Sequence, residues 1–291
     1  MRRTLLSIAG IAMLCPAGAL FAQPAPDPPK VLRIFREDVK EGKGPGHEKS
    51  EASFMEAAAK AQYPANILGM TTLTGTPQAW FLEAHDSFDS IAKAEAALDK
   101  PEFETLEALD AEFISGSRSW IAVYQPDLSF HGQEMMQALP KARYFNVTMM
   151  RVQSGHDQEF AEIGHMAVDA SQKSINDQPV AVYQVVSGMP DGTYLLFEPS
   201  ASLKALDSAD ERSRAMLQAM GDSGAARFLK AIRDNIASAE ALLFVINPKM
   251  SYVSKDIAAA DPDFWNQKPA ELAKPAARKP AAKTARKAEN K

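Results

Sequence analysis

The two halves of this chain repeat the same short motifs in the same order. Phe81–Phe88 (FLEAHDSF) and Leu196–Leu203 (LFEPSASL) align at an offset of 115 residues. Three more pairs follow the same order at offsets from 109 to 122: Gly46-His47-Glu48 with Gly155-His156-Asp157, Thr74–Pro77 with Ser187–Pro190, and Tyr124–Ser129 with Ile246–Ser251. We interpret this pattern as a tandem duplication of a unit of about 100 residues.

Each unit shows the same succession of secondary-structure signals. β-branched and aromatic residues predict a first strand, a helical stretch follows the Gly-His-acid motif, and two extended runs joined by Gly-x-Pro form a hairpin. A second helix, capped by Ser87 or Ser202, and a closing strand complete the unit. The predicted ranges are 31–39, 51–62, 67–73, 79–84 and 119–125 in the first unit, and 143–152, 158–173, 180–186, 193–198 and 241–247 in the second.

The order β-α-β-β-α-β is that of a ferredoxin-like unit, with a four-stranded antiparallel sheet and both helices on one face. The other face of such a sheet must be buried. We therefore predict an α+β fold in which two tandem ferredoxin-like units pack sheet to sheet as a pseudo-dimeric α/β barrel. The predicted organisation is a first repeat at 31–130, a linker at 131–142, a second repeat at 143–253, and a linker with a tail at 254–291.

The duplicated pattern resembles the dimeric α/β-barrel superfamily over residues 31–253. The residues that carry the resemblance are the Gly-His-acid motifs, each followed within two helical turns by Phe54 or Phe160. NIPSNAP-like, antibiotic-biosynthesis monooxygenase-like and EthD-like proteins belong to this superfamily. The resemblance implies a ligand cavity between the sheets, but no complete catalytic set of the superfamily matches this chain.

Glu83 and Glu198 occupy equivalent positions, so a pseudo-twofold axis would make them a facing or diagonal pair between the sheets. Two such carboxylates could act as an acid/base pair or bind a cation. The simpler interpretation, which we favour, is that each glutamate pairs with an arginine on a neighbouring first strand: Arg33, Arg36 or Arg143.

Four further polar residues are candidates to line the same cavity. His85 follows Glu83 on the same strand face and has no counterpart in the second unit, where Ser200 stands. Asn146, Tyr183 and Tyr194 could add an amide and two hydroxyls, although buried tyrosines commonly bond within the core. His47 and His156 are interpreted as helix-entrance residues, and no metal site is predicted.

The two ends of the chain differ from its body. Arg2 and Arg3, an apolar stretch and small residues up to Ala22 predict a signal peptide at 1–22 and a periplasmic or secreted protein, with an uncleaved anchor as the alternative. The only cysteine, Cys15, lies in that segment, so the mature chain would have no disulfide. The last 24 residues contain eight Lys or Arg and predict a disordered basic tail, either simply solvated or touching an anionic envelope polymer or membrane surface.

Two classes of function fit these observations. Because no complete catalytic set is found, we favour an exported small-molecule-binding protein of the cell envelope that holds a small apolar or amphipathic molecule between its sheets, without a cofactor. The alternative is a cofactor-free or haem-dependent monooxygenase-like enzyme using Glu83, His85 and Glu198. The chain carries a net charge of −5 in spite of its basic tail, which argues against nucleic-acid binding by the folded part. The chain is expected to be a monomer with pseudo-dimeric symmetry, or a higher oligomer.

Overall fold

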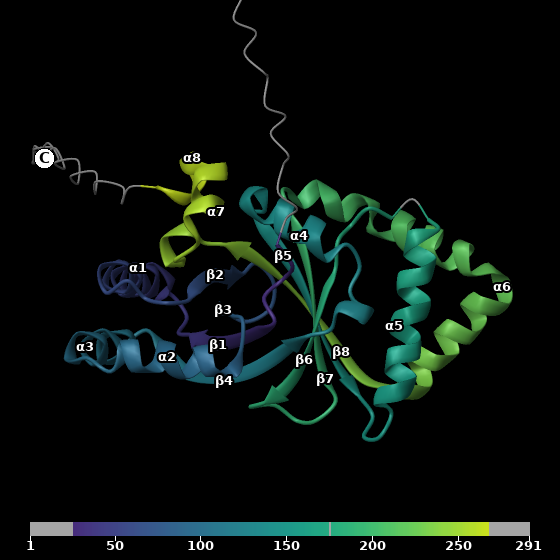
Figure 1. Ribbon diagram of the computed structural model, residues 1–291, viewed down its shortest axis with the longest axis horizontal. Coiled ribbons are helices and arrows are strands. Elements are labelled where there is room, and N and C mark those ends of the chain that lie inside the picture. Colours follow the sequence, from purple (N-terminus) through teal and green to yellow (C-terminus); the bar gives the residue numbers. More distant parts are fainter. Residues whose placement is uncertain (1–25, 175, 268–291) are drawn as a thin grey trace, which may run out of the picture.

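The computed structural model describes residues 26–174 and 176–267 (Figure 1). The signal peptide predicted at 1–22 and the basic tail after residue 267 lie outside the described residues. None of the helices in the described part combines the length and apolar character that crossing a membrane requires.

Eight antiparallel strands close into a barrel in the order β1-β3-β2-β8-β5-β7-β6-β4. Within each half the strand order is that of a ferredoxin-like sheet, β4-β1-β3-β2 and β8-β5-β7-β6. The strands of the first half are β1 (Val31–Val39), β2 (Asn66–Thr72), β3 (Gln78–His85) and β4 (Ile114–Tyr124). Those of the second half are β5 (Tyr144–Val152), β6 (Ala181–Ser187), β7 (Thr193–Ser200) and β8 (Ile236–Ile246).

The two sheets share a core between their faces, and strand pairing also joins them along both edges. β2 pairs with β8 through Met70 and Ile246, and β4 pairs with β6 through Tyr124 and Tyr183. These ladders leave no free strand edge between the halves. The predicted sheet-to-sheet packing therefore takes the form of one continuous barrel wall.

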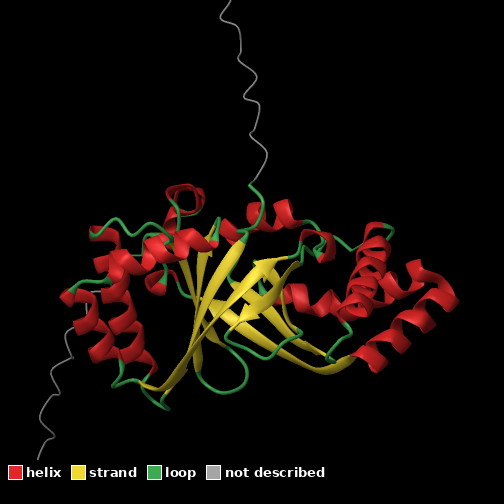
Figure 2. Ribbon diagram, turned by 60° about the horizontal axis from the view of Figure 1, so that its bottom comes forward, coloured by secondary structure: helices red, strands yellow, loops and turns green. Residues whose placement is uncertain are grey.

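Helices cover the outer face of each half, so the barrel is flanked by helices on two sides (Figure 2). The first half carries α1 (Gly44–Lys60), α2 (Phe88–Leu98) and α3 (Pro101–Asp110), and the second carries α5 (Asp157–Gln172) and α6 (Ala209–Asn235). Ser87 caps α2 with its side chain, as predicted. Ser202 precedes a 3-10 helix, η3 (Leu203–Ser208), and makes no side-chain cap.

Large apolar side chains from both halves fill the barrel interior. The ring of Trp80 lies 5.1 Å from that of Trp120 and 5.0 Å from that of Phe244, and Phe145 and Phe197 are also almost fully buried there. The expectation of a ligand cavity between the sheets is therefore wrong. Inward-facing positions carry bulky residues in both halves, so their faces meet in a close-packed core.

Short helices cover one end of this core. They are α4 (Gly132–Ala138), η2 (Leu139–Lys141), α7 (Lys255–Ala260) and α8 (Pro262–Trp265). Met135 and Trp265 join the core, and the indole nitrogen of Trp265 donates to the carbonyl of Pro140 at 2.9 Å. Residues 131–142 and 254–267, which we expected to be linkers, therefore form part of the packed molecule.

Candidate functional site

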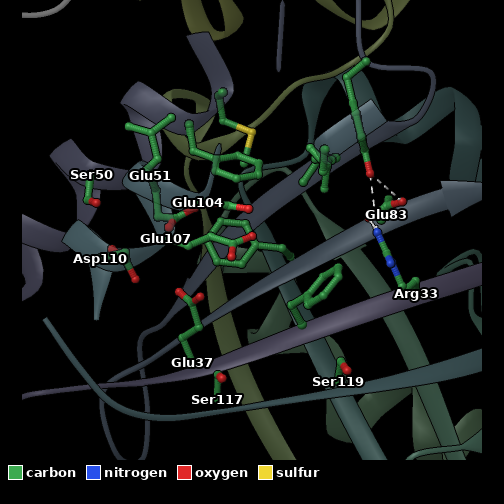
Figure 3. A pocket seen from close by; sticks show the side chains of 18 of the residues that line it. Arg33, Glu37, Ser50, Glu51, Glu83, Glu104, Glu107, Asp110, Ser117 and Ser119 are labelled. Atoms are coloured by element: carbon green, nitrogen blue, oxygen red, sulfur yellow. Dashed lines mark hydrogen bonds and ion pairs between the residues drawn. The ribbon is translucent and has the colours of Figure 1, made fainter. Parts of the chain in front are cut away.

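The larger of two described cavities, of about 930 Å³, lies between the outer face of the first-half sheet and helices α1, α2 and α3. Alternation along β1 and β3 points Phe35 and Phe81 to this face, where Phe54 and Met55 of α1 meet them. Polar groups gather at two places, around Arg33 and Glu83 on one side and around Glu37 and Asp110 on the other (Figure 3). This combination of apolar walls and converging polar groups is typical of ligand sites.

The Glu83 carboxylate is the centre of a buried polar network. Arg33 of β1 donates to Glu83 Oε2 through Nη2 at 2.8 Å, and the Tyr63 hydroxyl donates to Oε1 at 3.0 Å. His85 Nε2 lies 2.6 Å from the same Oε1. Arg33 also forms an ion pair with Glu95 at the end of α2. Both glutamate oxygens are thus engaged by the protein.

These partners keep Glu83 charged. Burial alone would raise its pKa, but the hydrogen bond with His85 and the charge of Arg33 together hold the pKa below its ordinary value. Burial and the Glu83 charge raise the pKa of Tyr63. His85 Nδ1 lies 3.2 Å from the hydroxyl of Ser90, so both ring nitrogens have partners within the protein. The network therefore holds the Arg33 guanidinium at the cavity wall.

Three carboxylates and an imidazole form a second cluster at the other side of the cavity. One potential ligand atom from each of Glu37, His47, Glu51 and Asp110 lies within 4.8 Å of all the others. His47 Nε2 is 2.6 Å from Glu37 Oε2 and 3.8 Å from Asp110 Oδ2. Burial, together with the charges of the neighbouring carboxylates, raises the pKa of both Glu51 and Asp110. This cluster is the group of residues best suited to a metal among those described.

A second cavity, of about 550 Å³, lies in the other half between its sheet and helices α5 and α6. Its walls are mostly apolar, with Phe160, Met216 and Leu217 among them. Glu198 projects into it from β7 and accepts a hydrogen bond of 2.9 Å from Asn146 of β5.

The structure separates the predicted glutamate pair. Glu83 and Glu198 occupy equivalent strand positions, but both face outward and lie in different cavities, so the expectation of a facing or diagonal pair is wrong. Glu83 instead pairs with Arg33, as the favoured interpretation of the sequence expected. Arg143 pairs with Asp261 rather than with Glu198.

The two predicted tyrosines are bound within the protein and line neither cavity. Tyr183 lies inside the barrel, and its hydroxyl donates to the Pro29 carbonyl at 3.0 Å. Tyr194 packs against Phe160 on the outer face of the second half and donates to Asp157 at 3.0 Å. Tyr183 is thus part of the barrel core, and Tyr194 faces away from the barrel interior, which corrects the expectation of cavity hydroxyls.

Sequence reasoning missed the cluster of Glu37, His47, Glu51 and Asp110. One signal was present, because His47 and Glu51 are spaced i, i+4 and so share a helix face. Glu37 on β1 and Asp110 at the end of α3 are distant in sequence, and only the packing of α1 and α3 on the sheet brings them together.

The residues around the two cavities do not fit a haem. Neither described lining contains a histidine or a cysteine to serve as an axial ligand, and the hydroxyl of Tyr63, which lines the first cavity, is already bonded to Glu83. His165, on α5 beside the second cavity, is exposed and is not part of its lining. We therefore derive no step through a haem.

Comparison with known proteins supports the fold. A candidate monooxygenase from Fusobacterium nucleatum subsp. nucleatum matches with a TM-score of 0.52 at 12% identity, over 75% of this chain and 93% of that protein. A candidate monooxygenase from Lactobacillus acidophilus (TM-score 0.48, 7% identity, 74% and 93% covered) and a mutant chlorite dismutase from Candidatus Nitrospira defluvii (0.47, 11%, 82% and 98%) also match. No protein-family model and no curated protein sequence match the chain. The similarity is one of fold.

Proposed function

We propose that this protein binds a small amphipathic molecule in the first-half cavity. The observation that carries the proposal is the cavity itself, whose volume of about 930 Å³ lies within the range of small-molecule sites. Its aromatic and aliphatic walls suit an apolar body. The buried network around Glu83 presents a fixed guanidinium and a tyrosine hydroxyl at one wall, which supplies orientation.

The charge of the lining favours a ligand with a positively charged group. Two arginines, Arg33 and Arg118, face eight carboxylates: Glu37, Glu51, Glu83, Glu95, Asp99, Glu104, Glu107 and Asp110. Arg33 is already paired with Glu83 and Glu95. Even if Glu51 and Asp110, whose pKa values are raised, are protonated, six carboxylates remain against two arginines. This negative charge in a partly desolvated space attracts cations and repels anions.

A matched pair of probes tests the proposal. 1-Naphthylmethylamine and 1-naphthylacetate share an apolar ring and differ in the sign of their charge, and their fluorescence reports binding. We expect the amine to bind at least about tenfold more tightly than the carboxylate, a difference of about 1.4 kcal/mol. Equal affinities, or tighter binding of the carboxylate, would contradict the proposed ligand class.

A pair of cavity-filling variants identifies the site. Ser119 lies on β4 opposite Phe35 and lines the first cavity, so Ser119→Phe should place a ring in the binding space and weaken binding of the amine. Thr148 on β5 lines the second cavity, so Thr148→Phe would place a ring there instead and should leave binding of the amine unchanged. If Thr148→Phe alone abolishes binding, the ligand occupies the other half.

A second candidate function is an oxygenase-like enzyme that uses the same cavity. Its support is the fold match to the candidate monooxygenase from Fusobacterium nucleatum. The test is oxygen uptake with 1-naphthol, an electron-rich aromatic compound of the same size as the probes. Uptake above that of buffer, removed by Ser119→Phe, would support an enzyme, and no uptake would leave binding as the function.

The proposed location is the periplasm or the exterior of the cell. It rests on the N-terminal segment, which lies outside the described residues. Fractionation of cells that express the full chain, followed by N-terminal sequencing, tests it. Recovery from the cytoplasm with Met1 intact would contradict export.

A further inference from the structure

We infer that Glu37, His47, Glu51 and Asp110 bind one divalent first-row metal ion at the edge of the first cavity. The inference rests on this cluster alone and goes beyond the proposed binding of an amphipathic molecule. β1 supplies Glu37, the first three turns of α1 supply His47 and Glu51, and the last residue of α3 supplies Asp110. Three elements thus converge on one point.

The spacing of the four groups suits a metal ion. Their ligand atoms lie within 4.8 Å of one another. Ligands on opposite sides of an octahedral ion are about 4.2 Å apart when each bond is about 2.1 Å long. Closing the widest separation by about 0.6 Å, a movement that the side chains can make by small rotations, would bring a pair of ligands on opposite sides of the ion to bonding distance.

Asp110 is a buried carboxylate without a hydrogen-bond partner among the described residues. The residue is 5% exposed, and within the described structure neither of its carboxylate oxygens makes a hydrogen bond of normal geometry. His47 Nε2 lies 3.8 Å from Asp110 Oδ2, so the carboxylate points into the cluster. Leaving a buried carboxylate without hydrogen bonds is costly, and a bound cation would remove that cost.

The cluster is short of positive charge. In the described residues, the ion pairs of Glu37 and Asp110 involve only His47, and Glu51 has none. When its three carboxylates are ionised, as metal binding requires, one imidazole leaves a net negative charge even if the ring is protonated. A divalent cation supplies the missing charge and can be coordinated by all four groups.

The fold does not require these acids. Arg33 on β1 pairs with Glu83, and Asn146 on β5 pairs with the equivalent Glu198, so Arg33 and Asn146 occupy equivalent positions. Counting four residues further along each strand, Glu37 on β1 corresponds to Met150 on β5. The Gly-His-acid motifs likewise align Glu51 of α1 with Phe160 of α5.

Met150 and Phe160 line the second cavity, so the same architecture packs well with apolar side chains at these positions. Carboxylates in the first half therefore point to a ligand that the second half does not bind.

The ligand set identifies the class of ion. One imidazole nitrogen with three carboxylates suits Mn²⁺, Fe²⁺ or Zn²⁺, whereas Ca²⁺ and Mg²⁺ prefer oxygen ligands alone. Glu37, Glu51 and Asp110 also line the cavity, which gives the ion a route of entry and an open coordination position.

Metal stoichiometry provides the direct test. The full chain is treated with a chelator, incubated separately with Zn²⁺, Mn²⁺ and Mg²⁺, desalted, and analysed by elemental mass spectrometry and titration calorimetry. We expect one equivalent of Zn²⁺ or Mn²⁺ and no retained Mg²⁺. Absorption bands of bound Co²⁺ in the visible range give a second readout.

Variants locate the ion. Asp110→Asn and Glu51→Gln should weaken Zn²⁺ binding by at least about tenfold. Glu159→Gln is the matched control, because Glu159 lies beside His156 in the second half and is exposed. It should leave Zn²⁺ binding unchanged.

The inference is overturned if wild-type protein retains no stoichiometric Zn²⁺ or Mn²⁺, or if both cluster variants fold and bind as tightly as wild type. Because wild-type stoichiometry is measured first, a variant that fails to fold does not leave the question open. Binding of the naphthalene probes is measured separately, so loss of the metal site and loss of the ligand site can be told apart.

Discussion

At the scale of single residues, two carboxyl groups in one cavity have pKa values shifted in opposite directions. Glu83 and Asp110 are both buried carboxylates, and burial alone would raise the pKa of each. Arg33, His85 and Tyr63 surround Glu83, and its pKa is lowered. Asp110 faces Glu37 across the cluster, and its pKa is raised. The partners, and not the depth of burial, decide which carboxylate is stable as an anion.

Replacing Glu83 should reveal how much its network stabilises the fold. In Glu83→Gln the buried Arg33 loses its buried carboxylate and keeps only the exposed Glu95 as an ion-pair partner, so the free energy of unfolding should fall by about 3 kcal/mol near neutral pH. Urea unfolding measures this change. Glu198→Gln is the matched control, because Glu198 bonds to the neutral Asn146, and it should lose about 1 kcal/mol or less.

The pH dependence of the Glu83→Gln effect has a definite sign. The folded-state pKa of Glu83 lies below the unfolded value of about 4.3, so ionised Glu83 stabilises the fold above that pH. Its contribution is lost as the pH falls through the lowered folded-state pKa. The stability difference between wild type and Glu83→Gln should therefore shrink on acidification. A difference that grows with acid would contradict the assigned direction.

At the scale of elements, close backbone contacts join the segment after β8 to the first half. Gly69 on β2 packs against the 3-10 helix η4 (Pro248–Met250), and its amide donates to the Ser251 hydroxyl at 2.9 Å. A Cβ atom at Gly69 would lie 2.1 Å from the backbone oxygen of Met250. The glycine is thus required by the approach of two backbones, and its backbone conformation is not left-handed.

Gly69→Ala should force β2 and η4 apart. The clash is with backbone and cannot be relieved by turning a side chain, so we expect a loss of about 3 kcal/mol of unfolding free energy. Gly116→Ala on β4 is the control, because a Cβ there meets only Asp38 Oδ2 at 4.0 Å. Thermal unfolding compares the two, and equal midpoints would show that β2 and η4 pack less closely than described.

At the scale of the whole molecule, closure of the barrel makes the two halves interdependent. Trp80 of the first half packs against Phe244 of the second, and β2–β8 and β4–β6 ladders join the sheets. α8, at the end of the described chain, returns to cover the barrel end through Trp265. Unfolding of one half would expose the core of the other, so we expect one cooperative transition.

Trp265→Ala should test the contribution of the barrel end. The indole is 7% exposed, packs in the core and donates to Pro140, so truncation should cost about 3–5 kcal/mol. Leu109→Ala, at a position 52% exposed on α3, should change stability by less than about 0.5 kcal/mol. Calorimetry measures both variants. A Trp265→Ala protein as stable as wild type would show that α8 does not hold the end closed.

Local patterns were sufficient for the eight strands and their order, but not for the short helices at 132–141 and 255–265, which lie in segments expected to be linkers. β-branched and aromatic residues predict the strand at 31–39, which is β1, and the serine before Phe88 predicts the start of α2. The alternation of side chains along a strand places Phe81 and Glu83 on one face of β3 and Leu82 on the other. These properties depend on residues close in sequence, which is why the sequence by itself determined them.

Only the tertiary structure decided what each face meets. Alternation separates Glu83 from Leu82, but it does not say which of the two faces the other sheet, and the expected cavity was placed on the wrong side. Leu82 lies in the shared core, and Glu83 faces the helices. Glu37 and Asp110 meet only because α1 and α3 pack over β1, a contact between distant segments that depends on the shapes of all three elements.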